Sequence, residues 1–570
     1  MKKMFSYLLP FRFRMMAGFI IKVMGTVAEL FIPFLLSYIL DNVIEQNSIR
    51  KIIIYGVLMV LCAALTCICN IVANRMAAKV TANFTKAMRS DLFAKTIKLS
   101  SKYVDDYTIP SLESRITTDT YNVHNFIGMM QRMGVRAPFL LIGGIGITLF
   151  MDSVLALVMI ATLPIIFITV YGISRQGVPL YSDVQKSVDS MVRVVREDIQ
   201  GIRVIKALSK NEYENLRYDK VNLALSKKER KAGTIMSIVN PVMTLLMNLG
   251  IAAVVSVAAI RVVQGTSTSA TVIAFMQYFT LISMAMMSLS RMFVMYTKCA
   301  ASAKRITEVL ETPERFFVIS EEAEGSEYIS FENVSFSYFG KSKNLENISF
   351  SLKKGESLGI IGATGSGKTT LIKLLLRFYD SDEGKISINN KSIKEYTKDE
   401  LTSIFGVAMQ NDFLYAETIE ENIRFGRDIL FENVERAAKI AQAHDFITAF
   451  LGGYQHKVAS KGTNISGGQR QRLFIARAVA NEPEILILDD SSSALDYKTD
   501  ANLRKALKEN LKGTTVITVA QRVSSVKDCD LILVLEEGRI IGSGKHQQLL
   551  ENCPEYREIS DSQMGGAIID

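Results

Sequence analysis

The segment 357–370, SLGIIGATGSGKTT, has the residue types and spacing of a loop that binds phosphate. Aliphatic residues precede the glycines and helix-forming residues follow them, so the pattern predicts a strand, a loop and a helix. Lys368 can reach the β- and γ-phosphates of a nucleotide, and the Thr369 hydroxyl can bind Mg²⁺. The backbone can curl around an anion because three positions of the loop are glycine, namely Gly362, Gly365 and Gly367. The segment therefore predicts binding of a nucleoside triphosphate.

Two adjacent acids, Asp489 and Asp490, follow the aliphatic run at residues 485–488. A carboxylate at the end of a buried strand can hold a metal ion. The second carboxylate can act as a general base that activates water, or it can stand in the wrong place for that task. The pair by itself leaves both alternatives open.

A third group of residues, Ser466, Gly467, Gly468 and Gln469, opens an arginine-rich amphipathic stretch. A serine followed by two glycines at the start of a helix predicts a second helix N-terminus that can bind an anion. The alternative is a serine that only caps a surface helix.

The composition of the chain changes along its length. The 570 residues are 49% hydrophobic and 22% charged, and the length suggests two to four domains. Long stretches before residue 290 contain no charged residue and reach the roughly 20 residues that a helix needs to cross a bilayer. We expect six membrane-spanning helices, at about 15–40, 52–74, 133–151, 153–174, 236–260 and 268–290.

Positive charge is concentrated in the long connections between these spans. The segments 75–136 and 175–231 contain ten and thirteen Lys and Arg residues, against about three in the short turns. The positive-inside rule therefore places the long loops and both termini of this multi-pass membrane protein in the cytosol. The net charge of +9 is then mainly an orientation signal, which argues against nucleic acid as a partner.

The pattern changes again beyond the polar, acidic stretch 318–328, which we interpret as a linker. Short β-type runs then alternate with helical ones, as in an α/β nucleotide-binding domain. The predicted fold class is an α-helical polytopic membrane domain followed by an α/β P-loop nucleotide-binding domain. We place the membrane domain, with six spans and long cytosolic helical extensions, at 1–317 and the nucleotide-binding domain at 328–565.

Together these motifs resemble the ATP-binding cassette (ABC) superfamily, and in particular exporter half-transporters with six spans and one nucleotide-binding domain. The resemblance covers nearly the whole chain and implies ATP and Mg²⁺ as cofactors, in a bacterial cell membrane with the nucleotide-binding domain in the cytosol. The implied ATP contacts are Tyr338 on adenine, the Walker A residues Gly362, Gly365, Gly367, Lys368, Thr369 and Thr370, Gln410, the signature residues Ser466, Gly467, Gly468 and Gln469, and Asp489. The implied Mg²⁺ contacts, partly through water, are Thr369, Gln410 and the Walker B residue Asp489.

In this superfamily two nucleotide-binding domains dimerise head to tail, and each ATP lies between the Walker motifs of one domain and the signature of the other. The resemblance implies that residues 493–496 form the loop that crosses the dimer interface. It also implies coupling helices in the long cytosolic loops, which we place near 111–121 and 211–219.

Three positions depart from the superfamily's pattern. Asp490 stands where turnover-competent members have glutamate as the general base, Gln521 replaces the switch histidine, and Ser460 replaces an acid before the signature. The aspartate carboxylate lies about 1–1.5 Å further back, whereas a base has to stand about 2.6–3.2 Å from the water it deprotonates. An ångström of misplacement can cost on the order of 100-fold in rate.

Asp490 and Gln521 belong to the same composite site, whereas the signature that serves the opposite site is intact. Random loss of function would affect both composite sites and not one alone, so we expect a heterodimer. The partner half-transporter would carry the Walker B glutamate and the switch histidine, and this chain would turn over ATP mainly in complex with it. The alternative is a homodimer in which Asp490 supports slow hydrolysis.

We expect an ATP hydrolysis-coupled translocase that exports a small amphipathic compound or a peptide. The alternatives are an ATP-gated regulatory membrane subunit without transport, and an importer with the exporter-type fold. Glu29 in the first span is a candidate for substrate contact, or it pairs with Lys22 or water. The methionines of the sixth span either line an adaptable apolar path or face lipid and neighbouring helices; they are Met276, Met284, Met286, Met287, Met292 and Met295.

Overall fold

The computed structural model describes residues 2–313, 327–338, 340, 342–410, 412–491 and 493–564. It divides into two compact units, one comprising Met1–Ile97 with Thr108–Thr312, the other Lys98–Tyr107 with Pro313–Asp570. The first unit is helical, and the second combines two sheets with short helices. A helical membrane domain followed by an α/β domain was expected, and this fold class is confirmed.

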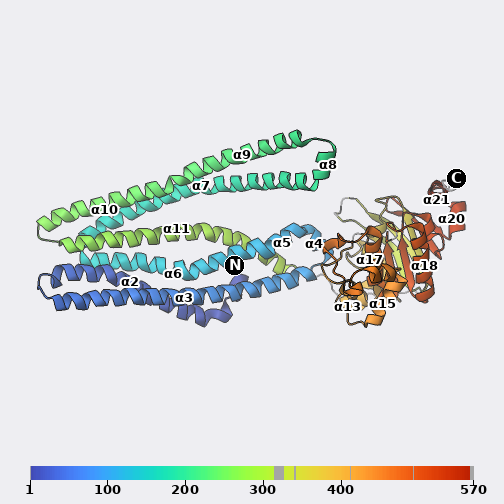
Figure 1. The fold of residues 1–570 in the computed structure, drawn as a ribbon, viewed down its shortest axis with the longest axis horizontal. Helices are drawn as coiled ribbons and strands as arrows, with labels where there is room; N and C mark the ends of the chain where they lie inside the picture. Colours follow the sequence, from blue (N-terminus) through green and yellow to red (C-terminus); the bar gives the residue numbers. More distant parts are fainter. Residues whose placement is uncertain are drawn as a thin grey trace. The chain divides into compact units, whose positions relative to one another are not determined.

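Seven long helices make up most of the first unit and lie side by side in Figure 1. They are α2 (Arg12–Tyr38), α3 (Ile49–Lys98), α6 (Thr120–Met151), α7 (Ser153–Gln200), α9 (Asn211–Ser237), α10 (Val239–Val263) and α11 (Ser269–Glu311). Shorter helical segments are α1 (Lys2–Ser6), η1 (Leu9–Phe11), η2 (Ile39–Val43), α5 (Ile109–Ser114), η3 (Arg115–Asp119) and α8 (Ile202–Ala207).

Five helical stretches within the described residues are long and apolar enough to cross a membrane. Four of them contain the expected spans at 15–40, 52–74, 133–151 and 236–260, and the fifth contains all but the first residue of the span at 268–290. The sixth expected span, 153–174, begins in a shorter apolar stretch, Ser153–Thr169, at the start of the 48-residue helix α7. The number of six spans therefore stays a prediction.

Residues of α2, α6, α7, α10 and α11 form one shared apolar core. Helix α6 packs against α2 and α11, and α7 packs against α9 and α10. The core includes Leu30, Leu140 and Tyr278, and the Tyr278 hydroxyl donates a hydrogen bond of 2.6 Å to the Leu30 carbonyl oxygen. A Cβ atom at Gly144 would lie 2.9 Å from Cγ1 of Ile282, so a glycine there allows α6 and α11 to approach closely.

Glu29 in α2 pairs with Arg136 in α6, and not with Lys22. Arg136 donates hydrogen bonds from Nη2 to Glu29 Oε1 at 2.6 Å and from Nε to Glu29 Oε2 at 3.1 Å. The interpretation of Glu29 as a partner of Lys22 is therefore wrong. The guanidinium group of Arg136, on the neighbouring helix α6, neutralises the Glu29 carboxylate with the bidentate geometry for which arginine is suited.

The long connection that follows the second apolar helix divides between the two units, and the coupling helices near 111–121 and 211–219 stay a prediction. Its segment Lys98–Tyr107, which includes α4 (Ser101–Tyr107), groups with the second unit, whereas 111–121 and 211–219 belong to the first. Asp119 is fully buried in the first unit, where it accepts hydrogen bonds from Ser302 Oγ at 2.8 Å and Arg305 Nε at 2.7 Å. The loop segment that belongs with the nucleotide-binding unit thus precedes 111–121.

The second unit contains a four-stranded sheet of order β2-β1-β4-β5 and a six-stranded sheet of order β10-β9-β3-β8-β7-β6. The strands are β1 (Ile329–Phe336), β2 (Leu345–Leu352), β3 (Ser357–Gly362), β4 (Glu383–Ile388), β5 (Lys391–Ser392), β6 (Phe405–Ala408), β7 (Ile485–Asp489), β8 (Thr515–Val519), β9 (Leu531–Glu536) and β10 (Arg539–Gly544). All neighbours from β9 to β6 pair in parallel, and only β10 is antiparallel. One core joins the smaller sheet and α12 to the larger sheet, and a second core lies between the larger sheet and α14 to α18.

The helices of this unit are short. Besides α4 they are α12 (Lys368–Leu375), α13 (Lys398–Ile404), α14 (Ile419–Arg424), α15 (Phe431–Ile440), α16 (His444–Ala449), α17 (Gly467–Val479), α18 (Tyr497–Asn510), α19 (Val523–Val526), α20 (His546–Asn552) and α21 (Pro554–Met564). Three single turns, at Ile393–Glu395, Gly453–Gln455 and Ser460–Gly462, complete the described helices.

Candidate nucleotide site

Four parallel strands end at one edge of the six-stranded sheet, and each is followed by a residue with a functional side chain. The neighbours β3, β8, β7 and β6 run in the same direction, so their carboxyl ends lie together. The phosphate loop follows β3, the two aspartates lie at the end of β7, and Gln521 and Gln410 each come two residues after β8 and β6. The sheet therefore gathers groups from four separate parts of the sequence.

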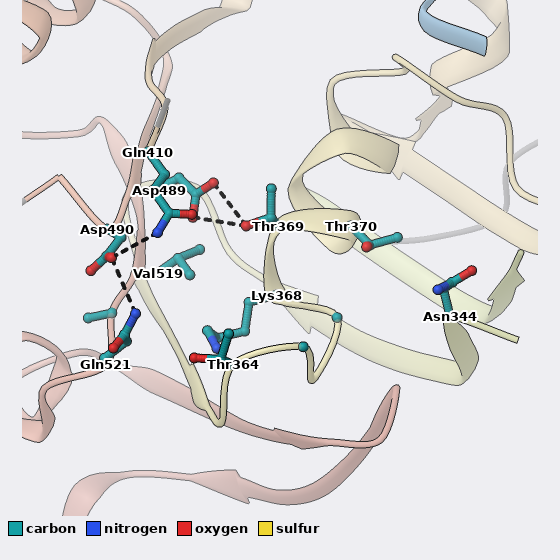
Figure 2. A pocket seen from close by; sticks show the side chains of 13 residues that line it. Asn344, Thr364, Lys368, Thr369, Thr370, Gln410, Asp489, Asp490, Val519 and Gln521 are labelled. Carbon is teal, nitrogen blue, oxygen red and sulfur yellow. Dashed lines mark hydrogen bonds between the residues drawn. The ribbon is translucent and has the colours of Figure 1, made fainter. Parts of the chain in front are cut away.

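A cavity of about 300 Å³ lies at this edge (Figure 2). Its lining residues are Asn344, Thr364, Gly365, Gly367, Lys368, Thr369, Thr370, Gln410, Asp489, Asp490, Val519, Ala520 and Gln521. Lysine, hydroxyl, amide and carboxylate groups thus surround one space, which suits a ligand that carries both phosphates and a cation.

The glycines give the loop a shape that other residues would not hold easily. Gly365 and Gly367 have φ values of 88° and 103°, in the left-handed region. A Cβ atom at Gly367 would lie 2.7 Å from Leu345 Cδ2, whereas a Cβ atom at Gly365 would meet nothing within 4 Å. The loop then ends in α12, whose first N–H groups have no acceptor within the helix and can bind an anion.

The two glycines form a matched pair for a test of this loop. Gly365→Ala is expected to cost about 1–2 kcal/mol, from backbone strain alone. Gly367→Ala is expected to cost about 2–4 kcal/mol because the clash with Leu345 and the backbone adds to the strain. Thermal unfolding of the full chain without nucleotide measures both effects, and equal shifts for the two variants would contradict this account.

Lys368, the first residue of α12, turns back over the loop. Its Nζ donates hydrogen bonds to the carbonyl oxygens of Gly362 at 2.8 Å and Ala363 at 2.7 Å. Burial lowers the pKa of this ammonium group, while the nearby charges of Asp489 and Asp490 act in the opposite direction. The phosphates of a nucleotide would supply the negative charge that this partly buried cation lacks.

Asp489 and Thr369 face each other across the cavity (Figure 2). The Thr369 hydroxyl lies 3.1 Å from Asp489 Oδ2 and donates a hydrogen bond to it. Asp489 is only 1% exposed, and burial raises the pKa of its carboxyl. Together with the amide oxygen of Gln410, these groups form an oxygen donor set that fits Mg²⁺.

Asp490 has a different environment from its neighbour. Its backbone is in the left-handed region, with φ of 49°, and its Oδ2 accepts hydrogen bonds from Gln410 Nε2 at 3.2 Å and Gln521 Nε2 at 3.4 Å. Burial raises the pKa of this carboxyl, and the hydrogen bond from Gln410 opposes that rise. Two neutral amide donors therefore hold the second carboxylate (Figure 2).

Tyr338 lies beside the cavity and does not line it. Its hydroxyl is 3.3 Å from Thr370 Oγ1, and its ring packs edge-on against Phe336 and Tyr379 with centroids 4.9 and 5.0 Å apart. The Tyr338 amide donates to Asn344 Oδ1 at 3.0 Å, which ties this aromatic group to the cavity wall.

The signature residues form a helix start outside the cavity. The Ser466 hydroxyl accepts a hydrogen bond from the Gln469 amide at 3.2 Å, and Gln469 Oε1 accepts one from the Ser466 amide at 2.9 Å. This capping box begins α17, so the capping role of Ser466 is observed. Among the described residues that line the cavity, none belongs to 466–469.

Gln471, one turn into α17, connects this helix to the chain after Asp490. Its Nε2 lies 3.2 Å from Ser493 Oγ and 3.4 Å from the Asp490 carbonyl oxygen. Its Oε1 accepts a hydrogen bond of 3.0 Å from the Ala494 amide. One side chain therefore joins the signature helix to the segment that follows the acids.

Each of the two units matches a known protein family. The family described as "ABC transporter transmembrane region" matches residues 15–286, and the family "ABC transporter" matches residues 345–493. The chain is 34% identical over 570 residues to the uncharacterised ABC transporter ATP-binding protein YfiB of Bacillus subtilis, covering 99% of both chains. The chain belongs to the ABC transporter family. This ABC transporter is also 30% identical to the uncharacterised ABC transporter ATP-binding protein Rv1273c of Mycobacterium tuberculosis, covering 99% of this chain and 98% of that one.

A solved structure of a bacterial Atm1-family ABC exporter with ATP bound has the same fold as this ABC transporter. The TM-score is 0.82 at 23% identity, and the match covers 98% of this chain and 99% of that one. The membrane region and the ATP-binding domain of an ABC half-transporter are thus both present in one chain, and the second unit is an ATP-binding domain.

The structure of this ABC transporter brings together most of the expected site residues. Nine line the cavity: Gly365, Gly367, Lys368, Thr369, Thr370, Gln410, Asp489, Asp490 and Gln521. Gly362 lies at the start of the loop, Tyr338 beside it, and Ser466 to Gln469 outside the cavity. The sequence did not indicate four further lining residues, Asn344, Thr364, Val519 and Ala520, of which only Thr364 lies within a motif.

Proposed function

We propose that this ABC transporter chain is one half of a heterodimeric exporter whose own ATP site clamps nucleotide and hydrolyses it poorly. Its signature helix would complete a hydrolytic site on a partner half-transporter that carries the Walker B glutamate and the switch histidine. The membrane unit would carry a small amphipathic compound or a peptide across the plasma membrane of a bacterium.

ATP would bind in the 300 Å³ cavity with Mg²⁺. Lys368 and the N–H groups at the start of α12 would hold the phosphates, and the Tyr338 ring would lie against the adenine. Thr369, Gln410 and Asp489 would hold Mg²⁺, partly through water. When bound, the ion would neutralise charge on the phosphate oxygens during hydrolysis.

The environment of Asp490 carries the proposal of weak hydrolysis. A general base needs a group that can reach the attacking water and accept its proton. Asp490 has the shorter acidic side chain, and its Oδ2 already accepts hydrogen bonds from Gln410 and Gln521. The bond from Gln410 opposes the rise in pKa that burial causes, so it limits the gain in basicity. Gln521 cannot act as the general base instead, because an amide nitrogen accepts no proton at neutral pH.

The position of the signature residues supports the need for a second subunit. Ser466 to Gln469 do not line the described part of the cavity, and the capping box nevertheless preserves the helix N-terminus that they form. An intact N-terminus of this kind can bind an anion presented by another chain. We infer that the γ-phosphate held by the partner is this anion.

The experiment compares the isolated chain with the pair. We expect the purified full chain in lipid nanodiscs to bind ATP but to turn it over at least about 100-fold more slowly than the complex with its partner. Within the complex, Asp490→Asn is expected to change the rate little, whereas replacement of the partner's Walker B glutamate by glutamine should abolish turnover. Full turnover by the isolated chain would show a homodimer instead.

A further inference from the structure

A second cavity, of about 620 Å³, lies among the helices of the membrane unit. Its lining residues come from α2, α3, α6 and α11, and they are Lys22, Asn70, Asn74, Asn125, Met129, Arg132, Met133, Arg136 and Met295. The lining thus combines cations, primary amides and methionines. None of these described lining residues is acidic.

The positive charge of the cavity is only partly neutralised. Glu29 forms a bidentate pair with Arg136, which accounts for one of the three cations. None of the ion pairs found among the described residues includes Lys22 or Arg132. Two positive charges of this cavity, a buried lysine and an exposed arginine, therefore remain without an acidic partner among the described residues.

Lys22 is held in position by neutral groups. It is 4% exposed, and its Nζ donates hydrogen bonds to Asn70 Oδ1 at 2.6 Å and Asn74 Oδ1 at 3.1 Å. Amide oxygens orient the ammonium group without cancelling its charge. A buried cation with only neutral acceptors is costly, and an anion beside it would offset that cost.

Arg132 is the more accessible of the two cations. Its side chain is exposed, and its Nε donates a hydrogen bond of 3.0 Å to the Gly128 carbonyl oxygen one turn earlier on α6. This contact fixes the direction of the guanidinium group. Its planar fork suits a carboxylate, sulfonate or phosphate oxygen pair.

A smaller cavity of about 210 Å³ adjoins the first, because both are lined by Met133 and Arg136. Apart from Arg136, Ser288 and Arg291, its lining is apolar; the apolar residues are Met133, Ala137, Leu140, Leu281, Met284, Ala285 and Met287. Unbranched methionine side chains adapt to apolar groups of different shapes. A cationic cavity and a mainly apolar one, which also contains Arg291, thus share two lining residues.

We propose that these joined cavities bind an amphipathic anion. The acidic head group would lie between Lys22 and Arg132, and the apolar body would extend past Met133 towards Leu140 and Leu281. The assignment of this ligand as the transported cargo rests on the proposed exporter function. It narrows the cargo from amphipathic compounds in general to those with a negative head group.

A pair of probes that differ only in charge tests the proposal. These are 11-(dansylamino)undecanoic acid and its methyl ester, titrated against the full chain in phosphatidylcholine nanodiscs, with protein-free nanodiscs subtracted. We expect saturable binding of the acid and binding of the ester that is weaker by about tenfold or more. Arg132→Gln should weaken binding of the acid by a similar factor and leave the ester unchanged.

Two further variants make the outcome unambiguous. Arg75→Gln on α3 removes an exposed arginine that lines neither cavity, so it should leave both titrations unchanged. Arg132→Glu should reverse the preference, so that the corresponding dansyl amine binds better than the acid. Equal binding of acid and ester to the unmodified chain, or equal effects of the variants at positions 75 and 132, would overturn the proposal.

The source of the anion can be distinguished in the same assay. If phosphatidylglycerol added to the nanodiscs weakens binding of the acid to the unmodified chain more than to Arg132→Gln, then the ligand is a lipid head group. If it weakens both equally, the ligand is a free amphiphile. The titrations contain neither ATP nor the partner, so their result is independent of whether the chain's own ATP site hydrolyses.

Discussion

The double variant Asp490→Glu, Gln521→His is expected to hydrolyse ATP at this chain's own site at least about 100-fold faster than the unmodified chain. The added methylene moves the carboxylate about 1–1.5 Å towards the position of the attacking water. Histidine at position 521 replaces one of the two amide donors to Asp490 with a ring whose nitrogen can accept or donate a proton near neutral pH.

The backbone at position 490 opposes this gain only slightly. Its φ of 49° is better tolerated by aspartate than by glutamate, at a difference of about 1 kcal/mol or less. A 100-fold rate increase corresponds to about 2.7 kcal/mol, so the gain should exceed the strain. Single-turnover hydrolysis is measured in the complex whose partner carries glutamine instead of its Walker B glutamate. An unchanged rate in that background would refute the assignment of these two positions.

Lys368→Ala is expected to weaken ATP binding to this chain by at least about 100-fold. The variant would remove the two or more charge-assisted hydrogen bonds that Lys368 is proposed to donate to phosphate, each with a contribution of about 1.5–3 kcal/mol. It also leaves Asp489 and Asp490 in the cavity without the cation that faces them. Equilibrium binding of a fluorescent ATP analogue to the full chain measures the change.

Lys505→Ala, at an exposed position of α18, is the matched control and should bind ATP normally. The pH dependence of the unmodified chain gives an independent check. Burial lowers the pKa of Lys368 in the nucleotide-free chain, and only the protonated amine binds phosphate well. Affinity should therefore fall as the pH rises through this lowered pKa, and Lys368→Ala should lose that dependence.

The nucleotide site could be predicted largely from the sequence because its groups follow the ends of parallel strands. The loop after β3 and the acids after β7 are each contiguous, and their spacing determines their chemistry. Asn344 has no such signal, since it precedes a strand of the other sheet and reaches the cavity through the fold of the Tyr338 segment. Residues that line a site from a distant loop carry no local pattern.

In the membrane unit, too, contacts between segments far apart in the sequence could not be predicted. Hydrophobicity located the helices. The interpretation of Lys22 as the partner of Glu29 was wrong, because helical periodicity relates residues only within one helix. Arg136 lies 107 positions later, and α6 brings it near through packing against α2. The association of Lys98–Tyr107 with the second unit likewise depends on tertiary contacts, such as the hydrogen bond from Tyr379 to Asp105.

If the chain acts in the proposed heterodimer, Gln471 limits how the two subunits can come to differ in sequence. Its amide holds both the signature helix and the backbone after Asp490, so a substitution there would disturb the ATP site of each subunit at once. Positions 490 and 521 face only one nucleotide cavity and can change without that penalty. In the proposed heterodimer we therefore expect sequence differences between the subunits to accumulate at positions such as 490 and 521, while Gln471 is retained in both.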